Sequence, residues 1–222
     1  LMDVWKAITV DHMPGEGVVV AVIDTGVNYK NSDLASSMWI NPGEIPNNGI
    51  DDDKNGYVDD VHGICVASDN PSQAQGDPMD YASHGTHCAG IIAMSAGDGG
   101  GVGVAYGSKI MAIKVGEGTF SLSAICVGLR YAADNGADVI SMSFSGEYGS
   151  ASEEAACKYA AQKCILVAAA GNDAKCTLGN PKLDRSNMAN HYPAAFDSVI
   201  GVMAYDNDNT IASFSDWDYQ LG

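Results

Sequence analysis

The run from Gly17 to Ile23 constrains the fold of this chain more than any other sequence feature. Its residues are apolar on both faces, as in the central strands of parallel sheets, and the run ends at Asp24. Parallel strands are joined by long crossover connections, which are usually helices. The run therefore predicts an α/β fold with a doubly wound, mainly parallel sheet.

Strand and helix patterns alternate along the rest of the chain. Ser121 and Ser150 are expected to cap helices, and Gly136 to stop one. We expect further strands at 109–115, 137–144, 164–170 and 198–204, and helices at 84–95, 121–135 and 150–163. This order predicts a three-layer arrangement with helices on both faces of the sheet, in a single domain over residues 1–222.

The charge balance excludes several classes of partner. The net charge is -17, and phosphate recognition needs a basic face, so we expect no nucleic-acid partner. The same charge argues against docking on an anionic membrane surface. No apolar run approaches the ~20 residues that cross a bilayer. We expect a protein without a membrane span that acts as a monomer.

Much of the acidic charge lies in the long insertion at 28–80, where residues 51–60 resemble an oxygen-rich calcium loop. Side-chain oxygens alternate, a glycine permits the sharp turn, and the carbonyl of the next residue faces inward. The expected Ca²⁺ ligands are Asp51, Asp53, Asn55, the carbonyl of Tyr57, and Asp59 or Asp60. Position twelve of the loop holds His62 in place of glutamate. A solvated run of charge and a magnesium site are the alternatives.

Asp24, His84 and Asn172 are the candidate catalytic residues. Asp24 and Asn172 follow predicted strands, and working residues of parallel sheets gather at the carboxyl ends of the strands. Taken singly, each has another interpretation, because Asp24 and Asn172 also suit ordinary turns. His84 and His87 are spaced to share a metal on one helix face, although we expect His87 to be an inward-facing structural histidine.

Three segments together resemble the subtilisin-like serine proteases, or subtilases. They are VAVIDTGV at 20–27, SHGTHCAGI at 83–91 and VAAAGN at 167–172, in the family's order and in the expected strand or helix context. The resemblance extends from about Trp5 to the end of the chain. It implies a peptidase that acts on polypeptides through an acyl-enzyme intermediate.

The resemblance also implies roles for individual residues. Asp24 would orient His84, His84 would exchange the proton of a serine hydroxyl, and Asn172 would stabilise the oxyanion. Two segments would line the substrate cleft, namely Ser143, Phe144 and Ser145 on one side and Ala169, Ala170 and Gly171 on the other. A pocket wall made of small residues suggests that an apolar or uncharged substrate side chain binds there.

The chain departs from the family pattern in two ways. Many members have glycine where this chain has Ser145. The nucleophile motif, Gly-Thr-Ser followed by Met-Ala, does not occur, and Ser83, Ser143 and Ser145 are poor substitutes. We expect the serine beyond Gly222 and the given chain to be inactive alone. The rival interpretations are a catalytically silent calcium-binding scaffold or binding module, and a metal-dependent hydrolase that uses Asp24, His84 and His87.

The family resemblance suggests several further features. A second calcium site would combine Asp33 with the loop 95–102. An inhibitory propeptide, which is common in the family, would precede Leu1. Separately, the absence of an initiator Met at position 1 gives the chain the character of a processed piece. Calcium dependence and cysteine content suit a secreted or secretory-organelle protein. Six cysteines permit disulfides, with Cys164 and Cys176 as the favoured pair, whereas Cys88, Cys126 and Cys157 also suit a reduced core.

Overall fold

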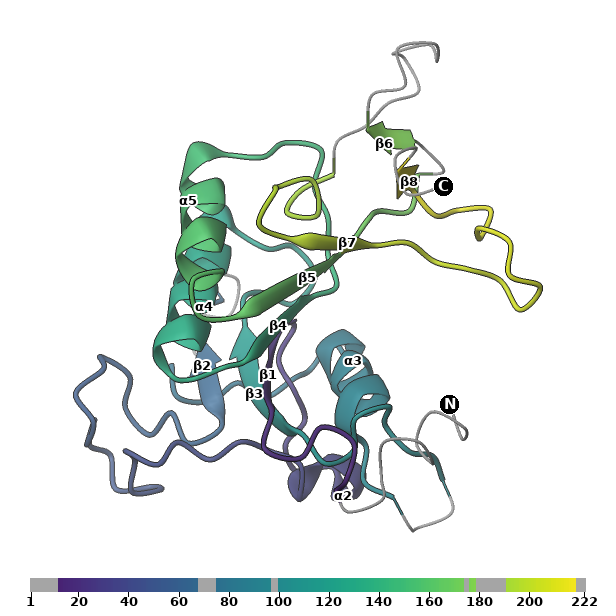
Figure 1. The fold of residues 1–222 in the computed structure, drawn as a ribbon. Helices are drawn as coiled ribbons and strands as arrows, with labels where there is room; N and C mark the ends of the chain where they lie inside the picture. Colours follow the sequence, from purple (N-terminus) through teal and green to yellow (C-terminus); the bar gives the residue numbers. More distant parts are fainter. Residues whose placement is uncertain (1–11, 68–74, 97–99, 174–175, 179–190, 219–222) are drawn as a thin grey trace.

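A computed structural model describes residues 12–67, 75–96, 100–173, 176–178 and 191–218 (Figure 1). A six-stranded parallel sheet forms its centre, in the order β2-β3-β1-β4-β5-β7. The strands are β1 (Val19–Asp24), β2 (Gly63–Cys65), β3 (Lys109–Lys114), β4 (Val139–Met142), β5 (Ile165–Ala169) and β7 (Ile200–Val202). A two-stranded sheet pairs β6 (Cys176–Leu178) with β8 (Trp217–Asp218).

Helices cover both faces of the sheet (Figure 1). They are α2 (Ser32–Ala35), α3 (His84–Ala93), α4 (Leu122–Asp134) and α5 (Ala151–Ala160). Ala21 and Ile23 of β1 belong to the core beneath α4 and α5, and the alternate residues Val20 and Val22 belong to the core beneath α2 and α3. Burial on both faces explains why this strand is uniformly apolar, and the predicted fold class is confirmed.

The local signals place the helix boundaries correctly. The Ser121 side chain accepts a hydrogen bond from Ala124 N at 3.3 Å, and the Ser150 side chain accepts one from Glu153 N at 3.1 Å. Gly136 follows α4 with φ +82°. The sequence analysis missed α2, β2, β6 and β8, which contain only two to four residues each.

Five cysteines have free thiols, namely Cys65, Cys88, Cys126, Cys157 and Cys164. Those of Cys65, Cys157 and Cys164 are buried, as a reduced core requires. The Cys164 thiol donates a hydrogen bond to the carbonyl of Ala137 at 3.0 Å. The expected Cys164–Cys176 disulfide is therefore not formed in this structure, because the thiol of Cys164 points into the core.

The described helices are all too short or too polar to span a bilayer. The longest, α4, runs for 13 residues, which is below the ~20 residues that the hydrocarbon core requires.

Helix α3 starts in close contact with the end of β1. A Cβ atom added to Gly85 would lie 2.2 Å from the carbonyl oxygen of Gly26 and 3.0 Å from Cβ of Asp24. One turn further along, a Cβ on Gly90 would meet only Cε of Met94, at 3.6 Å. Only the first of these glycines is needed for the approach of the two backbones.

Gly85→Ala and Gly90→Ala should therefore change stability in opposite directions. In a helix interior alanine is favoured over glycine by about 1 kcal/mol, so Gly90→Ala should raise the free energy of unfolding by up to that amount. Gly85→Ala should lower it by about 1–3 kcal/mol, because the methyl group overpacks the backbone contact. Denaturant unfolding of the two variants measures both changes. Equal effects would contradict the tight contact at Gly85.

Candidate active site

Three strand ends are level with one another at one edge of the sheet. Ile23 pairs with Met142, and Met142 pairs with Ala168. Because the strands are parallel and in register, the next residues, Asp24, Ser143 and Ala169, form a row at that edge. Asn172 lies exposed three residues beyond Ala169. The topology thus brings the strand-end candidates to one edge of the sheet.

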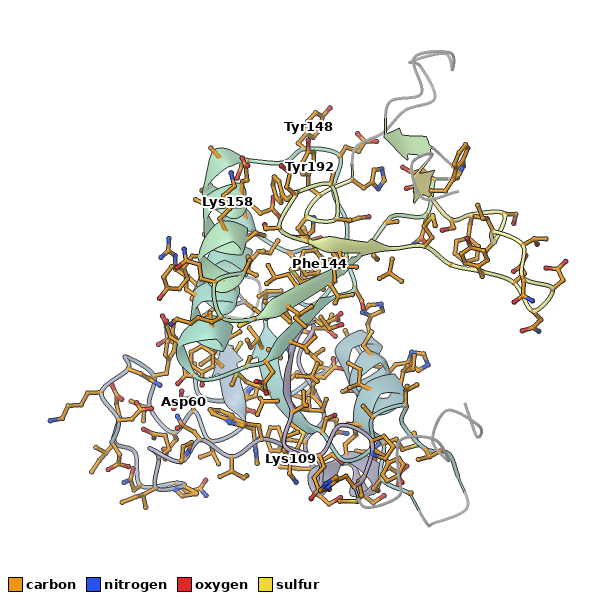
Figure 2. The ribbon with its side chains drawn as sticks, in the orientation of Figure 1. Asp60, Lys109, Phe144, Tyr148, Lys158 and Tyr192 are labelled. Carbon is orange, nitrogen blue, oxygen red and sulfur yellow. The ribbon has the colours of Figure 1, made fainter. Side chains whose placement is uncertain are left out.

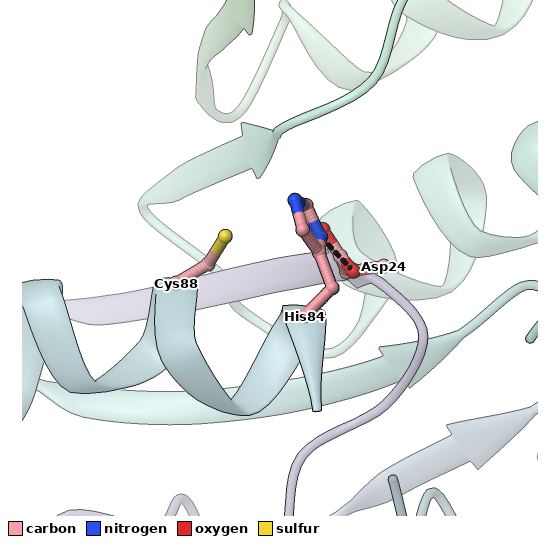
Figure 3. Close-up of side chains that lie close together, drawn as sticks. All are labelled: Asp24, His84 and Cys88. Carbon is pink, nitrogen blue, oxygen red and sulfur yellow. Dashed lines mark hydrogen bonds and ion pairs between the residues drawn. The ribbon is translucent and has the colours of Figure 1, made fainter. Parts of the chain in front are cut away.

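Asp24 and His84 form the central contact of the site (Figure 3). Nδ1 of His84 donates a hydrogen bond to Oδ1 of Asp24 at 2.7 Å. The carboxylate is fully buried, whereas the histidine side chain is 55% exposed. The second ring nitrogen points away from Asp24 (Figure 3). A buried carboxylate thus fixes one nitrogen of an exposed ring, and the other nitrogen points away from that carboxylate.

Backbone contacts hold the strand end against the helix start. The Thr25 hydroxyl accepts a hydrogen bond from Gly85 N at 2.9 Å, and the Thr86 hydroxyl accepts one from Asn28 N at 2.9 Å. Asp24 Oδ1 also accepts a hydrogen bond from Thr25 N at 2.7 Å. These reciprocal bonds orient both side chains of the Asp24–His84 pair.

Asp80 was missed in the sequence analysis, and it anchors the start of α3. One of its oxygens accepts hydrogen bonds from the backbone N–H groups of Ala82 and Ser83, and the other accepts from the backbone and hydroxyl of Thr86. Burial opposes the charge on this carboxylate, but these four bonds outweigh it and lower the pKa of Asp80. The signal was an aspartate shortly before a helix start whose N-cap residue, Ser83, makes no side-chain cap hydrogen bond.

The metal-hydrolase alternative grouped His84 with His87, whereas the structure places Cys88 beside His84. His87 is exposed, so the expectation of an inward-facing histidine is wrong. The third group that lies close to Asp24 and His84 is the thiol of Cys88 (Figure 3). Burial raises the pKa of that thiol, and the nearby carboxylates of Asp24 and Asp80 raise it further, whereas a hydrogen bond with Ser143 lowers it. The set Asp24, His84 and His87 is not brought together.

Two residues of the first proposed cleft wall, Phe144 and Ser145, border a cavity of about 380 Å³. The Phe144 ring contacts Phe120 edge-on at a centroid distance of 5.3 Å. Tyr148 and Tyr192, labelled in Figure 2, also line the cavity. Ser145 is exposed, Ala170 and Gly171 are buried, and Ala169 is half-buried. The aromatic lining gives this side of the site an apolar surface.

The acidic segment gathers a set of carboxylates that only partly overlaps the expected one. Asp51 and Asp53 lie together with Glu44, and each offers an oxygen within 4.8 Å of the others. Glu44 Oε1 accepts hydrogen bonds from the N–H groups of Asp52 and Asp53 at 2.9 and 3.2 Å. Its Oε2 is buried and finds no donor among the described residues. The sequence analysis missed Glu44 because it lies outside the ten-residue acidic run.

The carboxylate of Asp60, which is labelled in Figure 2, is buried and accepts hydrogen bonds from several uncharged side chains. It accepts hydrogen bonds from the hydroxyl of Tyr131 at 2.5 Å and from the amide groups of Asn55 and Asn41 at 2.8 and 3.1 Å. Burial and the contact with Asp60 raise the pKa of Tyr131 well above its usual value. Tyr57 packs edge-on against Tyr131, which connects the segment to α4.

Two other expected calcium ligands lie elsewhere. Asp59 accepts hydrogen bonds from the N–H groups of Asn48 and Gly49 at 3.1 and 3.0 Å, so both of its oxygens serve a backbone turn. Asp33 lies in the first turn of α2, and its carbonyl accepts a hydrogen bond from Ser95 N at 2.9 Å. Asp33 is thus beside the loop 95–102, of which residues 97–99 lie outside the described part.

Comparisons with known proteins agree with this geometry. The Subtilase family profile matches residues 15–221. The chain is 33% identical to "Thermitase" of Thermoactinomyces vulgaris over 92% of its length. It is 34% identical to "Halolysin-like extracellular serine protease Nep" of Natrialba magadii and 33% identical to "Intracellular serine protease" of Paenibacillus polymyxa, in each case over 90% of its length.

The matches cover only part of each relative. They extend over 61% of thermitase, 32% of the Natrialba protein and 53% of the Paenibacillus protein. The family match nevertheless spans nearly all of this chain, including β1, α3 and β5. On this evidence the chain belongs to the subtilase family.

Proposed function

We propose that this chain supplies the carboxylate, imidazole and amide of a subtilisin-type serine endopeptidase. The observation that carries the proposal is the 2.7 Å hydrogen bond from the exposed imidazole of His84 to the buried carboxylate of Asp24. A buried carboxylate behind a solvent-facing imidazole is the arrangement that general-base activation of a hydroxyl requires. The relatives, which are named as serine proteases, support the same activity.

In the proposed mechanism, Asp24 fixes the tautomer of His84 and stabilises the imidazolium that forms during the reaction. Nε2 of His84 takes the proton of a serine hydroxyl as the oxygen attacks the peptide carbonyl. The same nitrogen then donates that proton to the leaving amine. The serine comes from sequence outside residues 1–222, so the given chain is inactive alone.

Asn172 supplies the oxyanion donor in this proposal. Its exposed amide lies beyond β5 at the edge where Asp24 ends β1. An amide preorganised there stabilises the charge that develops on the carbonyl oxygen in the transition state. An extended polypeptide would lie between Ser143–Ser145 and Ala169–Gly171, with its backbone added beside one segment as a further strand.

A full-length protein extended through its serine should react with a fluorophosphonate probe. His84→Ala should abolish labelling, because the hydroxyl loses its base. Asp24→Asn should slow turnover by about 10⁴-fold, because the ring nitrogen loses its acceptor and the wrong tautomer is favoured. Labelling rates and peptide hydrolysis measure these effects, and His12→Gln, on an exposed histidine, is the control.

The same experiment separates the peptidase from a silent scaffold. A scaffold would keep the fold and the acidic segment, but the full-length protein would not react with the probe. Labelling that survives His84→Ala would rule out the proposed mechanism.

We also propose a structural calcium site in the acidic segment. Glu44, Asp51 and Asp53 fit a hard cation, since they converge and one buried oxygen of Glu44 finds no donor among the described residues. A bound Ca²⁺ would neutralise their mutual repulsion and tie the segment at 44–53 together. Magnesium is the alternative occupant. Asn55 and Tyr57 remain candidate ligands. Asp59 and Asp60 already accept hydrogen bonds with both oxygens, and Asp33 belongs to the separately proposed site at the loop 95–102.

Calcium should stabilise the full-length protein against heat. A ligand that binds only the folded state contributes about 2.7 kcal/mol at a hundredfold excess over its Kd. Glu44→Gln and Asp53→Asn should each reduce the calcium-dependent rise in Tm, whereas Asp208→Asn, which removes an exposed carboxylate outside the segment, should preserve it. Scanning calorimetry with calcium and with chelator measures the rise. A Tm that is the same with calcium and with chelator, measured at equilibrium, would contradict the calcium assignment.

Secretion and an inhibitory propeptide belong to the same proposal. One relative is named as extracellular and another as intracellular, so the compartment follows the individual protein and not the family. The acidic surface and the proposed calcium dependence favour a secreted or secretory-organelle protein.

A further inference from the structure

His191 is a buried histidine between two carboxylates, and neither the sequence motifs nor the proposed mechanism uses it. Its Nδ1 lies 3.3 Å from Oδ2 of Asp216, and its Nε2 lies 3.2 Å from Oδ2 of Asp173. The side chain of His191 is 6% exposed and that of Asp216 is fully buried. The burial of this histidine together with the carboxylate of Asp216 therefore calls for a structural explanation.

The ring lies between two carboxylates. Asp216 faces Nδ1 and Asp173 faces Nε2, each at ion-pair distance. Among the described residues Nε2 makes no hydrogen bond, whereas Nδ1 lies within hydrogen-bond distance of the hydroxyl of Ser145. His191, Asp173 and Asp216 are called the triad below.

The triad packs directly on the loop that carries Asn172. A Cβ atom added to Gly171 would lie 2.0 Å from Oδ2 of Asp216 and 2.3 Å from Nδ1 of His191. Asp216 N donates a hydrogen bond to the carbonyl of Gly171 at 3.0 Å, and Asp216 Oδ1 accepts one from Asp173 N at 3.2 Å. The residues on both sides of Asn172 are therefore bonded to Asp216.

The triad also reaches the opposite side of the proposed cleft. Nδ1 of His191 lies 3.3 Å from the hydroxyl of Ser145. Asp173, Asp216 and this hydroxyl are the charged and polar groups that face the ring within the described part of the chain. The ring therefore connects the Asn172 loop, the segment at Ser145 and the segment at Asp216.

We propose that His191 is a positioning residue for the oxyanion donor. Packed between Asp173 and Asp216 and in contact with Ser145, it fixes the backbone at Gly171–Asp173 and thereby aims the amide of Asn172 across the cleft from Ser145. This inference rests on the proposed peptidase function. His191 touches no reacting atom, so its effect on catalysis passes through Asn172.

The test is a double-mutant cycle in the full-length protein, with a chromogenic peptide as substrate. His191→Gln should lower kcat about 10-fold or more and change KM by less than about threefold, because a small misplacement of an aligned group slows chemistry more than binding. Asn172→Ala should lower kcat by about 10²–10³-fold. Adding His191→Gln to Asn172→Ala should have little further effect on kcat, because the amide that it positions is gone.

His12→Gln provides the matched control, since it makes the same change in an exposed histidine 3.5 Å from Glu16. If His191→Gln does not fold, Asp173→Asn replaces it, because that side chain is 43% exposed and still faces Nε2.

The outcomes distinguish the positioning role of His191 from the proposed peptidase function on which it rests. An active wild type whose His191→Gln variant keeps its kcat overturns the positioning role alone. Full additivity of the His191 and Asn172 changes also overturns it, because a purely structural effect would add. A full-length wild type with no turnover and no labelling overturns the proposed peptidase, and the positioning role with it.

Discussion

The close approach of the end of β1 to the start of α3 is the constraint on which the site depends. Asp24 can be both buried and within 2.7 Å of His84 only because Gly85 carries no side chain against Gly26. Thr25, Thr86 and Asp80 then supply hydrogen bonds across the junction. The carboxylate is thereby kept from water, and the imidazole of His84 is held with little freedom by a tightly packed backbone junction.

The architecture could be predicted because its signals are local and repeated. A strand that is apolar on both faces, such as β1, is consistent only with a buried parallel position, and serine caps mark α4 and α5. Short elements escaped prediction for a physical reason. Strand β2 has three residues inside the polar insertion, and it exists because it pairs with β3, a long-range contact that no local pattern encodes.

The candidate site was predictable only in part. Asp24 and His84 end and begin regular elements, so fold class alone brings them near each other. Glu44 and His191 are separated from the motifs by loops, and their places follow from tertiary contacts. Asp80 makes its bonds locally, with Ala82, Ser83 and Thr86. The His87 and Cys164 expectations failed because helix rotation and core packing, which spacing does not determine, decide where a side chain points.

The position of β2, directly after the acidic segment, links that segment to the edge of the sheet. This strand is one of the two edge strands of the sheet, and it lies so close to its neighbour that a Cβ on Gly63 would be 1.9 Å from the carbonyl oxygen of Ala112. If the segment preceding it came loose, the unsatisfied hydrogen-bonding groups of β3 would be open to pairing with another molecule. Cation supply would then govern self-association as well as heat resistance.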